Sequence, residues 1–446
     1  MYSPKTIKLA IDVVPITSLV PDPDNPREHK PAHIRDIAAS IAEFGMIDPP
    51  IARRGDRAIL AGHGTVLACI SLGYAEVPVI FVDHLSDIQS RGFRIAHNRL
   101  TETGKWNVKA LDRNFKILSA FKFDVTKTGF KTGEIDALRF GKDPLVEKAD
   151  DSAAEGDTAA PRPISRVGDL YTIRGHRILC GDSCIPDVVA RAMAGRRADS
   201  VLADMPFNVK VLGHVATGKG KARRHEFLKG SGELTRAQFK DWMVEAFKVQ
   251  NQFAKPGAVI FQFIDWRSIA DMILAGEEVF ESLLHVCIWH KGSGGMGSLW
   301  RGAYENCVIF RTAGAKHQNN VMLSKYGRHR SDVWSYPGCA SFGPERLEAL
   351  DGHPTPKNTA MLADALLDVM PLDGVVLDPF LGSSSTILAA DRIGRKGVGI
   401  ELDPRFFDAA IRRLEKAFGE PAIHESGATF AEIAARRIAE VSGKEG

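Results

Sequence analysis

Apolar positions along this chain follow two different patterns. Between residues 11 and 82, short β-branched runs alternate with amphipathic helical stretches at Ile34–Phe44 and Thr65–Leu72. After residue 163, longer continuous apolar runs recur with helical stretches between them: RILCGD, SVLADMPF, AVIFQFI, HVCIWHK, ENCVIFRT, VVLDPF and GVGIEL. Continuous apolar runs suit parallel strands that are covered on both faces. The pattern predicts a small α/β domain followed by a larger, doubly wound α/β domain.

The two predicted domains are separated by an acidic stretch rich in Ala, Gly and Pro, which shows neither helical nor strand periodicity. This stretch, residues 143–163, is predicted to be a linker. The first domain, residues 1–142, ends in a helical extension over Ile95–Gly141. The second domain is predicted at residues 164–420, and residues 421–446 are expected to form a helical tail.

Composition narrows the class of protein. The 446 residues are 44% hydrophobic and 25% charged, which excludes disorder of the whole chain. No run approaches the ~18 consecutive apolar residues of a membrane span, and the first residues lack the apolar core of a signal peptide, so a cytoplasmic protein is expected. The six cysteines form no CxxC pair, and we expect neither a disulfide framework nor a metal site. Because the net charge is only +3, nucleic-acid binding would depend on local basic clusters.

A nucleoside-binding layout lies near the end of the larger domain. Gly374–Asp391 places a buried strand before a Gly- and Ser-rich turn that opens a helix, so backbone N–H groups can approach a ligand closely. The next strand ends in Glu401, about twenty residues beyond the turn, where a carboxylate can accept both hydroxyls of a ribose. Tight packing of the turn is the alternative explanation of its glycines.

Three motifs around this layout resemble those with which DNA amino-methyltransferases hold S-adenosylmethionine. Asp378–Ser384 resembles DPFxGSG with serine in the last position, and His353–Lys357 resembles HPTxKP with Asn358 in place of the final proline. A Gly-Asp step at residues 181 and 182 resembles the one that meets the adenine. With a serine in the glycine position, either φ stays negative or cofactor affinity is reduced. The resemblance implies that S-adenosylmethionine is bound by Asp182, Thr355, Lys357, Asp378, Pro379, Phe380, Gly382, Ser384 and Glu401.

The predicted catalytic residues are Asp204, Met205, Pro206 and Phe207, which directly follow a strand-like run. The exocyclic amine of adenine or cytosine is a poor nucleophile because its lone pair is delocalised into the ring. If Asp204 accepts one amine hydrogen and a backbone carbonyl another, the lone pair points at the methyl sulfonium. Phe207 would stack on a base flipped out of the duplex. The tetrapeptide resembles the [D/N/S]PP[Y/F] signature of the same family, with Met205 in place of the first proline.

The order of the motifs carries further information. The catalytic tetrapeptide precedes the cofactor loop, which resembles the permuted β-class of the family, whose target-recognition segments would lie here at about residues 209–231 and 311–350. The resemblance covers roughly Val167 to Glu415 and implies a Rossmann-like methyltransferase domain with a doubly wound sheet. Methylation at carbon 5 of cytosine is disfavoured, because that chemistry uses a Pro-Cys nucleophile and the chain has no such dipeptide.

Two basic clusters are candidates for contact with double-stranded DNA. Lys210–Lys229 follows the catalytic motif and holds one acid, Glu226, whereas Arg311–Arg330 holds none. Such clusters neutralise phosphates and, with aromatic neighbours, read bases. A solvated surface loop is the alternative for the first cluster. The predicted DNA-binding residues are Lys219, Lys221, Arg223, Arg224, Lys325, Arg328 and Arg330.

The N-terminal segment from Ile11 to Val82 resembles the ParB/sulfiredoxin-like fold. In ParB proteins a GxxR-type segment at the start of a helix binds nucleotide phosphates. Gly62–Thr65 keeps the glycines of that segment but lacks its arginine. Nucleotide hydrolysis is therefore not expected, and a DNA-docking or regulatory role is preferred.

Together these observations favour site-specific methylation of the N6 amine of adenine in DNA, because aspartate at the head of the tetrapeptide is more typical of that target. Methylation of cytosine N4 stays open. A DNA-binding regulator with a degenerate methyltransferase domain is the alternative from another class, supported by the substitutions Met205, Ser384 and Asn358. The recognition sequence, a cognate nuclease of a restriction–modification system and the oligomeric state, a homodimer included, stay open.

Overall fold

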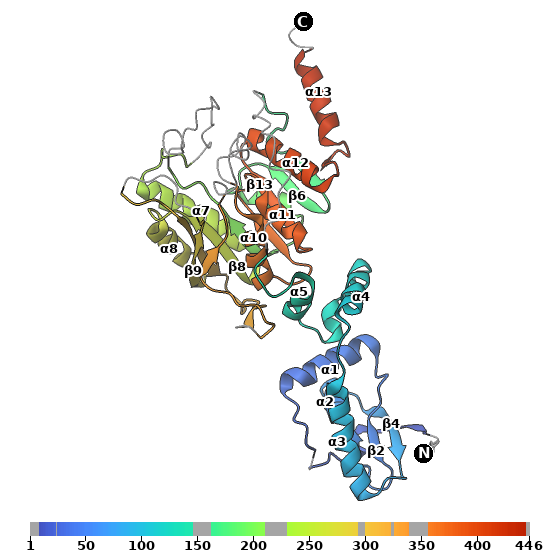
Figure 1. Ribbon diagram of the computed structural model, residues 1–446. Helices are drawn as coiled ribbons and strands as arrows, with labels where there is room; N and C mark the ends of the chain where they lie inside the picture. The colour runs from blue at the N-terminus through green and yellow to red at the C-terminus, as the bar shows by residue number, and fades with distance from the viewer. Residues whose placement is uncertain are drawn as a thin grey trace. The chain divides into compact units, whose positions relative to one another are not determined.

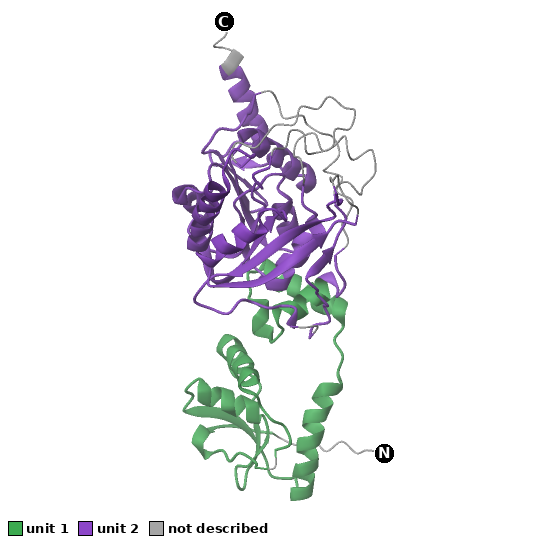
Figure 2. Cartoon of the chain, turned by 90° about the vertical axis from the view of Figure 1, so that its left-hand side faces the viewer, with its two compact units in different colours: residues 1–139 green, residues 140–446 purple. Residues whose placement is uncertain are grey.

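The computed structural model divides into two compact units, Met1–Arg139 and Phe140–Gly446 (Figure 2). It describes residues 9–23, 25–145, 162–209, 230–292, 299–322, 325–338 and 356–442. Most of the predicted linker, residues 146–161, lies outside these ranges. Each unit is built around a sheet of its own, so the two are described separately.

The first unit is a small α/β fold with a four-stranded sheet in the order β1-β4-β2-β3 (Figure 1). Its strands are β1 (Ile11–Pro15), β2 (Ile51–Arg53), β3 (Ile59–Ala61) and β4 (Glu76–Val82). Its helices are α1 (Pro31–Phe44), α2 (His63–Ser71), α3 (Asp87–Thr103), α4 (Val108–Ala120) and α5 (Thr132–Phe140), with 3-10 turns at Ile16–Ser18 and Val125–Thr128. Helices therefore occupy both stretches with helical periodicity, and α3 to α5 form the predicted helical extension.

Residues 62 to 64 of this unit have structural explanations. Gly62 adopts φ 85°, and a Cβ there would lie 2.9 Å from the backbone of Pro50, so only glycine fits. His63 is buried and its Nε2 accepts a hydrogen bond from the backbone N–H of Asp22 at 3.3 Å. This contact fastens the start of α2 to the segment that follows β1.

The second unit contains a ten-stranded sheet in the order β11-β9-β10-β8-β7-β12-β13-β6-β5-β14. Its strands are β5 (Leu170–Ile173), β6 (His176–Cys180), β7 (Ala198–Ala203), β8 (Ala254–Ile264), β9 (Ser282–His290), β10 (Tyr304–Arg311), β11 (Val333–Ser335), β12 (Val375–Asp378), β13 (Lys396–Glu401) and β14 (Ile423–His424). Its helices are α6 (Pro186–Met193), α7 (Arg236–Phe253), α8 (Ile269–Glu277), α10 (Thr359–Val369), α11 (Ser385–Arg392), α12 (Pro404–Phe418) and α13 (Phe430–Ser442). All seven apolar runs identified in the sequence are strands.

The middle of this sheet is parallel. β8, β7, β12, β13 and β6 are consecutive neighbours that all run in the same direction. The chain leaves β7 toward β8 on one side and leaves β12 toward β13 on the other side. The β7–β12 pair is therefore the point at which the strand order reverses, where open α/β sheets bind ligands.

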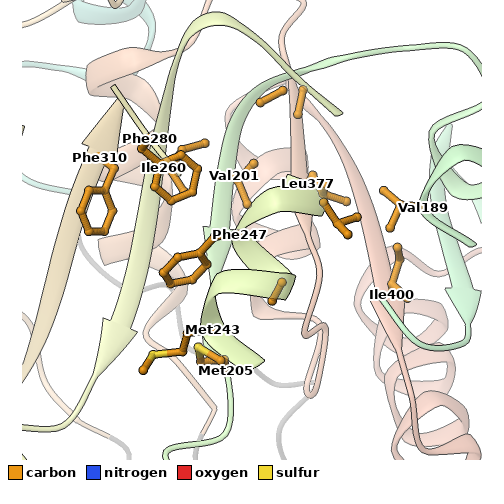
Figure 3. Close-up of a cluster of buried hydrophobic side chains, with 14 of the residues drawn as sticks. Val189, Val201, Met205, Met243, Phe247, Ile260, Phe280, Phe310, Leu377 and Ile400 are labelled. Carbon is orange, nitrogen blue, oxygen red and sulfur yellow. The ribbon is translucent and has the colours of Figure 1, made fainter. Parts of the chain in front are cut away.

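Helices cover both faces of the sheet, as alternation along the central strands requires. Val201 on β7 and Leu377 on β12 face a core shared with α6, α7 and α8, in which Phe247 packs against the sheet (Figure 3). Their chain neighbours Leu202 and Val376 face a second core shared with α10 and α11. The predicted doubly wound arrangement is confirmed.

One of the apolar runs does not fit the prediction of parallel strands. β10 pairs in the antiparallel sense with both β8 and β9, so β9 runs in the same direction as β8 and β10 alone is reversed among these runs. The side chains of β9 alternate in exposure at its end, where Cys287 and Trp289 are buried and Ile288 and His290 are exposed. One face of β9 at this end of the sheet is therefore open to solvent. In the part of the chain that the structure describes, no helix is long and apolar enough to cross a membrane.

A close contact between α8 and β10 yields a test of the packing. A Cβ on Gly276 would lie 2.1 Å from the ring of Phe310, whereas one on Gly302 would meet nothing within 4 Å. Gly276→Ala should therefore destabilise the second unit by about 1–3 kcal/mol in urea unfolding, although Gly→Ala in an open helix is normally stabilising. Gly302→Ala is the matched control and should change little. Equal stability of Gly276→Ala and wild type would contradict this packing.

Candidate active site

A cavity lies at the edge where the parallel strands of the second unit end. Asp182 follows β6, Asp204 follows β7, Asp378 ends β12 and Glu401 ends β13, so parallel pairing brings four acids to one edge. Most of the predicted catalytic and cofactor-binding residues line this cavity: Asp182, Asp204, Met205, Pro206, Phe207, Lys357, Asp378, Pro379, Phe380, Gly382 and Glu401. Thr355 lies outside the described residues.

Glu401 connects the end of β13 to the turn after β12. Its Oε2 accepts a hydrogen bond from the N–H of Gly382 at 2.9 Å, and its Oε1 accepts one from the N–H of Asp403, also at 2.9 Å. Burial raises the pKa of Glu401 to about 7, against the opposing effect of these donors. The carboxyl group is held rigidly at the cavity wall.

Asp378 shapes the same turn from the other strand. Its Oδ1 accepts a hydrogen bond from the N–H of Phe380 at 3.0 Å. Burial raises the pKa of Asp378 to about 7, although the hydroxyl of Thr386 acts in the opposite direction. A Cβ on Gly399 would lie 2.5 Å from Leu381, so the glycine lets the turn pack directly on β13.

Ser384, the N-cap of α11, stands where the family motif has glycine. It is fully buried and adopts a left-handed conformation with φ 61° and ψ 22°. The expectation that φ could stay negative is therefore wrong. Its Oγ donates to the carbonyl oxygen of Ser383 at 2.6 Å. Ser384 does not line the cavity, whereas its neighbours Ser383 and Ser385 do.

The predicted catalytic tetrapeptide is fixed from both sides. Met205 is 1% exposed and packs in the core beneath α7. This position therefore accepts an apolar side chain other than proline. Asn208, just after the tetrapeptide, has φ 55°. Its Oδ1 accepts from the N–H of Gly232 at 3.0 Å, and its Nδ2 donates to the carbonyl of Leu234 at 2.8 Å.

Lys357 occupies a place that the sequence did not indicate. It lines the cavity, but its Nζ lies 2.7 Å from Oδ2 of Asp204 and 2.9 Å from Oε2 of Glu305. Glu305 also forms an ion pair with Lys291. The ammonium group of Lys357 is 5.6 Å from the ring centre of Phe207. Its contacts are thus with the predicted catalytic carboxylate and aromatic ring.

The pKa values of this cluster reflect burial opposed by charge. Burial raises the pKa of Asp204, against the attraction of the Lys357 ammonium. Burial also acts to raise the pKa of Glu305, but Lys357 and Lys291 together lower it to about 2. Burial would lower the pKa of Lys357, yet the carboxylates of Asp204 and Glu305 raise it. Each charge therefore persists only because its neighbours have the opposite sign.

Sequence reasoning missed Glu305, Lys291 and Trp242. Trp242 lines the cavity from α7, and its indole Nε1 lies 3.3 Å from Sγ of Cys184. Glu305 is 9% exposed although it is an acid near the start of an apolar strand. An acid inside an apolar run indicates a buried carboxylate, so Glu305 could have been identified in the sequence as a candidate. The identity of its partner, however, depends on the fold.

Asn358, which replaces the proline of the family motif, has a clear structural role. It is the N-cap of α10, and its Oδ1 accepts from the N–H of Met361 at 2.9 Å. Its Nδ2 donates to the carbonyl oxygen of Pro337 at 3.1 Å. These bonds fix the residue next to Lys357.

The predicted DNA contacts divide into three groups. Lys219, Lys221, Arg223 and Arg224 lie outside the described residues. Lys325 is exposed, with its ammonium 5.3 Å from the ring centre of Tyr326.

Arg328 and Arg330 are engaged inside the protein instead. Arg328 is 3% exposed and donates to Asp364 at 2.6 Å, and Arg330 donates to Asp368 at 2.7 Å. Tyr336 donates to Asp364 as well, at 2.6 Å. These bonds attach residues 328–336 to α10. Arg328 and Arg330 therefore have a structural role in place of the predicted contacts with DNA.

Among the residues with a described position, no group of three or more His, Cys, Asp or Glu side chains is placed to hold a metal ion. On one side of the cavity the arrangement offers the acids Asp378 and Glu401, which hold the N–H groups of the turn. On the other side it offers the ion-paired carboxylate of Asp204 and the ring of Phe207.

Comparison with known proteins places this site in a family. Residues 198–412 match the family model described as DNA methylase. The type II methyltransferase M.ScaI of Streptomyces caespitosus is 35% identical over 100 residues, 22% of this chain and 33% of that protein. The type II methyltransferase M.HinfI of Haemophilus influenzae is 33% identical over 120 residues, 26% of this chain and 31% of that protein. The chain thus spans about a third of the length of these curated relatives.

The matched residues run from the start of β7 into α12, so they include both the tetrapeptide and the cofactor loop. The resemblance to DNA methyltransferases predicted from the motifs is confirmed over these residues. Among solved structures, the C-terminally truncated chromosome-partitioning protein ParB of Caulobacter crescentus, complexed with CTP-gamma-S, matches 30% of this chain and 72% of its own, at 25% identity and a TM-score of 0.23.

The left-handed conformation of Ser384 can be tested with two substitutions that both remove its hydroxyl. Ser384→Gly loses the bond to Ser383 but relieves the strain, whereas Ser384→Ala loses the bond and keeps a Cβ. We expect Ser384→Ala to be less stable than Ser384→Gly by about 1–2 kcal/mol in thermal unfolding. A Ser384→Ala variant at least as stable as Ser384→Gly would show that residue 384 carries no such strain.

Proposed function

Because residues 198–412 match the DNA methylase family, we propose that this chain transfers a methyl group from S-adenosylmethionine to the exocyclic amine of a base in double-stranded DNA. The observation that carries the proposal is the position of Asp204. Its carboxylate lies at the carboxyl end of β7, in the same cavity as the Gly- and Ser-rich turn and Glu401.

The residues at the turn fit a nucleoside cofactor. Both oxygens of Glu401 already accept backbone N–H groups, which leaves lone pairs directed at the cavity for the hydroxyls of a ribose. Asp182 lines the same cavity beside the end of β13, where it would contact the adenine, and its Oδ1 accepts a hydrogen bond from the N–H of Cys184 at 2.9 Å. When bound, S-adenosylmethionine supplies an electrophilic methyl group.

Asp204 and the residues beside it would prepare the amine. The carboxylate accepts one amine hydrogen and is placed to take the proton that nitrogen must lose as the carbon–nitrogen bond forms. Phe207 offers a ring for stacking with a flipped base. Burial of the site excludes water, so the few polar contacts that remain act strongly on the amine.

Adenine N6 is the proposed target, supported by aspartate at residue 204, which is more typical of that target in the family. Cytosine N4 is the second candidate, since its amine has the same donors and the same geometry. The exposed Lys325 and the basic residues Lys219, Lys221, Arg223 and Arg224 are proposed to contact DNA phosphates.

Substitution of Asp204 tests the reaction. Asp204→Ala should lower kcat for methyl transfer to mixed-sequence DNA by about 10²–10⁴-fold, because the amine loses its proton acceptor. Labelled S-adenosylmethionine and nucleoside analysis of the product measure this and identify the base. Asp241→Ala, on the exposed face of α7, is the matched control. Label in N4-methylcytosine would move the proposal to its second candidate, and a folded wild type without transfer would leave a DNA-binding regulator.

The raised pKa of Glu401 predicts how cofactor affinity depends on pH. An ionised carboxylate accepts ribose hydroxyls better than a neutral one, so below pH 7 binding must first remove a proton from a group whose pKa is about 7. Affinity should therefore fall with decreasing pH, by up to about tenfold per pH unit from this group.

Calorimetric titration with S-adenosylmethionine at pH 8, 7 and 6 measures this effect. Glu401→Gln is neutral throughout, so its affinity should be weaker at pH 8 and should approach that of wild type at pH 6. A ratio of the two affinities that does not change with pH would rule out ionised Glu401 as the ribose acceptor.

A further inference from the structure

Four groups of alternating charge form a row that begins at Asp204 and leads away from the amine-binding position. Asp204 pairs with Lys357 at 2.7 Å, Lys357 pairs with Glu305 at 2.9 Å, and Glu305 pairs with Lys291. Each group comes from a different part of the chain: the end of β7, the segment before α10, β10, and the residue after β9.

Sheet topology explains why these four segments meet. β10 is antiparallel to β8, and β9 is antiparallel to β10, so β10 begins and β9 ends at the edge where β7 and β8 end. Glu305 pairs with Trp289 in this register, and Lys291 lies two residues beyond Trp289, which makes it a diagonal neighbour of Glu305 on the same face. The antiparallel strands thus supply the outer half of the row.

The surroundings of Lys357 explain why it needs a second partner. Lys357 is 7% exposed, and its ammonium lies 5.2 Å from the ring centre of Phe263 and 5.8 Å from that of Trp289. In such surroundings the ammonium needs carboxylate partners, and with a single one the whole of its charge would be balanced by that carboxylate alone. With Glu305 on the far side, Lys357 is held by two ion pairs and binds Asp204 through Oδ2.

We propose that Glu305 is a positioning residue for methyl transfer: it anchors Lys357, and Lys357 in turn fixes the carboxylate of Asp204 in the orientation that accepts the amine hydrogen. The inference rests on the proposed function. Among the described residues, no contact connects Glu305 to the turn at residues 379–385. Glu305 should therefore affect the chemical step rather than cofactor binding.

The test is a mutant cycle of Glu305→Gln and Lys357→Met with kcat, KM for DNA and Kd for S-adenosylmethionine as readouts. Glu305→Gln should lower kcat by about 10–100-fold, the scale of a small misplacement of reacting groups, with Kd within about twofold of wild type. In the Lys357→Met background, Glu305→Gln should have little further effect, because the two residues act through one chain of contacts. Glu305→Asp, which keeps the charge, should retain more activity than Glu305→Gln.

Glu278→Gln is the matched control, since it removes a carboxylate from the ion pair with Lys240 on the surface and should leave kcat unchanged. Undiminished kcat in a folded Glu305→Gln overturns the positioning role alone, as does an equal loss in both backgrounds. If Glu305→Gln does not fold, Glu305→Asp provides the test, because its carboxylate is one methylene shorter and cannot hold Lys357 in the same place. A loss of kcat at unchanged Kd supports the proposal, and kcat equal to wild type overturns it. Absence of transfer by wild type would refute the proposed function and this inference with it.

Discussion

The parallel pairing of β7 with β12 is the contact on which the candidate site depends. Val376 pairs with Ser200 and Leu377 with Val201, although about 175 residues of chain separate the two strands. One strand leads into Asp204 and the other into the Gly- and Ser-rich turn. A methyl donor and its acceptor must meet within a few ångströms, so both halves of the proposed methyl transfer require this pair. The cores on the two faces of the sheet hold it in place.

Buried charge is the second constraint, and two clusters of ion pairs near the site satisfy it among the described residues. In the cavity, Lys357 stands between Asp204 and Glu305. Behind it, Arg328 and Arg330 pair with Asp364 and Asp368 on α10. The second cluster holds the helix whose first turn follows Lys357, and Asn358 fastens that turn to residue 337. The structural arginines therefore support the lysine of the site, since a misplaced α10 would move its ammonium group away from Asp204.

The departures from the family motifs have local explanations. Met205 fills a core position, Asn358 caps α10, and Ser384 takes the left-handed conformation that a glycine would take more easily. A degenerate domain would have no reason to keep Asp204 and Glu401 beside these substitutions. With these structural explanations, the substitutions are weaker support for a non-catalytic protein than they are when only the sequence is considered.

The sequence by itself determined the elements and the motifs, because both are local. Apolar runs identified seven strands, and the motifs around Asp204, Asp378 and Glu401 predicted catalytic and cofactor-binding residues. Hydrophobic periodicity depends only on neighbouring residues, and short motifs need only their own backbone. For this reason the doubly wound sheet and many of the residues lining the cavity could be predicted without coordinates.

Only the tertiary structure decided which partners meet. The reversed direction of β10 was not visible in the sequence, because a buried apolar run looks alike in either direction. The ion pairs of Lys357 with Glu305 and Asp204 join residues that are 52 and 153 positions apart along the chain. Arg328 and Arg330 looked like DNA-binding residues because charge in a sequence carries no sign of burial. Ion pairs between distant residues depend on how strands are ordered in the sheet, and that order is a property of the fold as a whole.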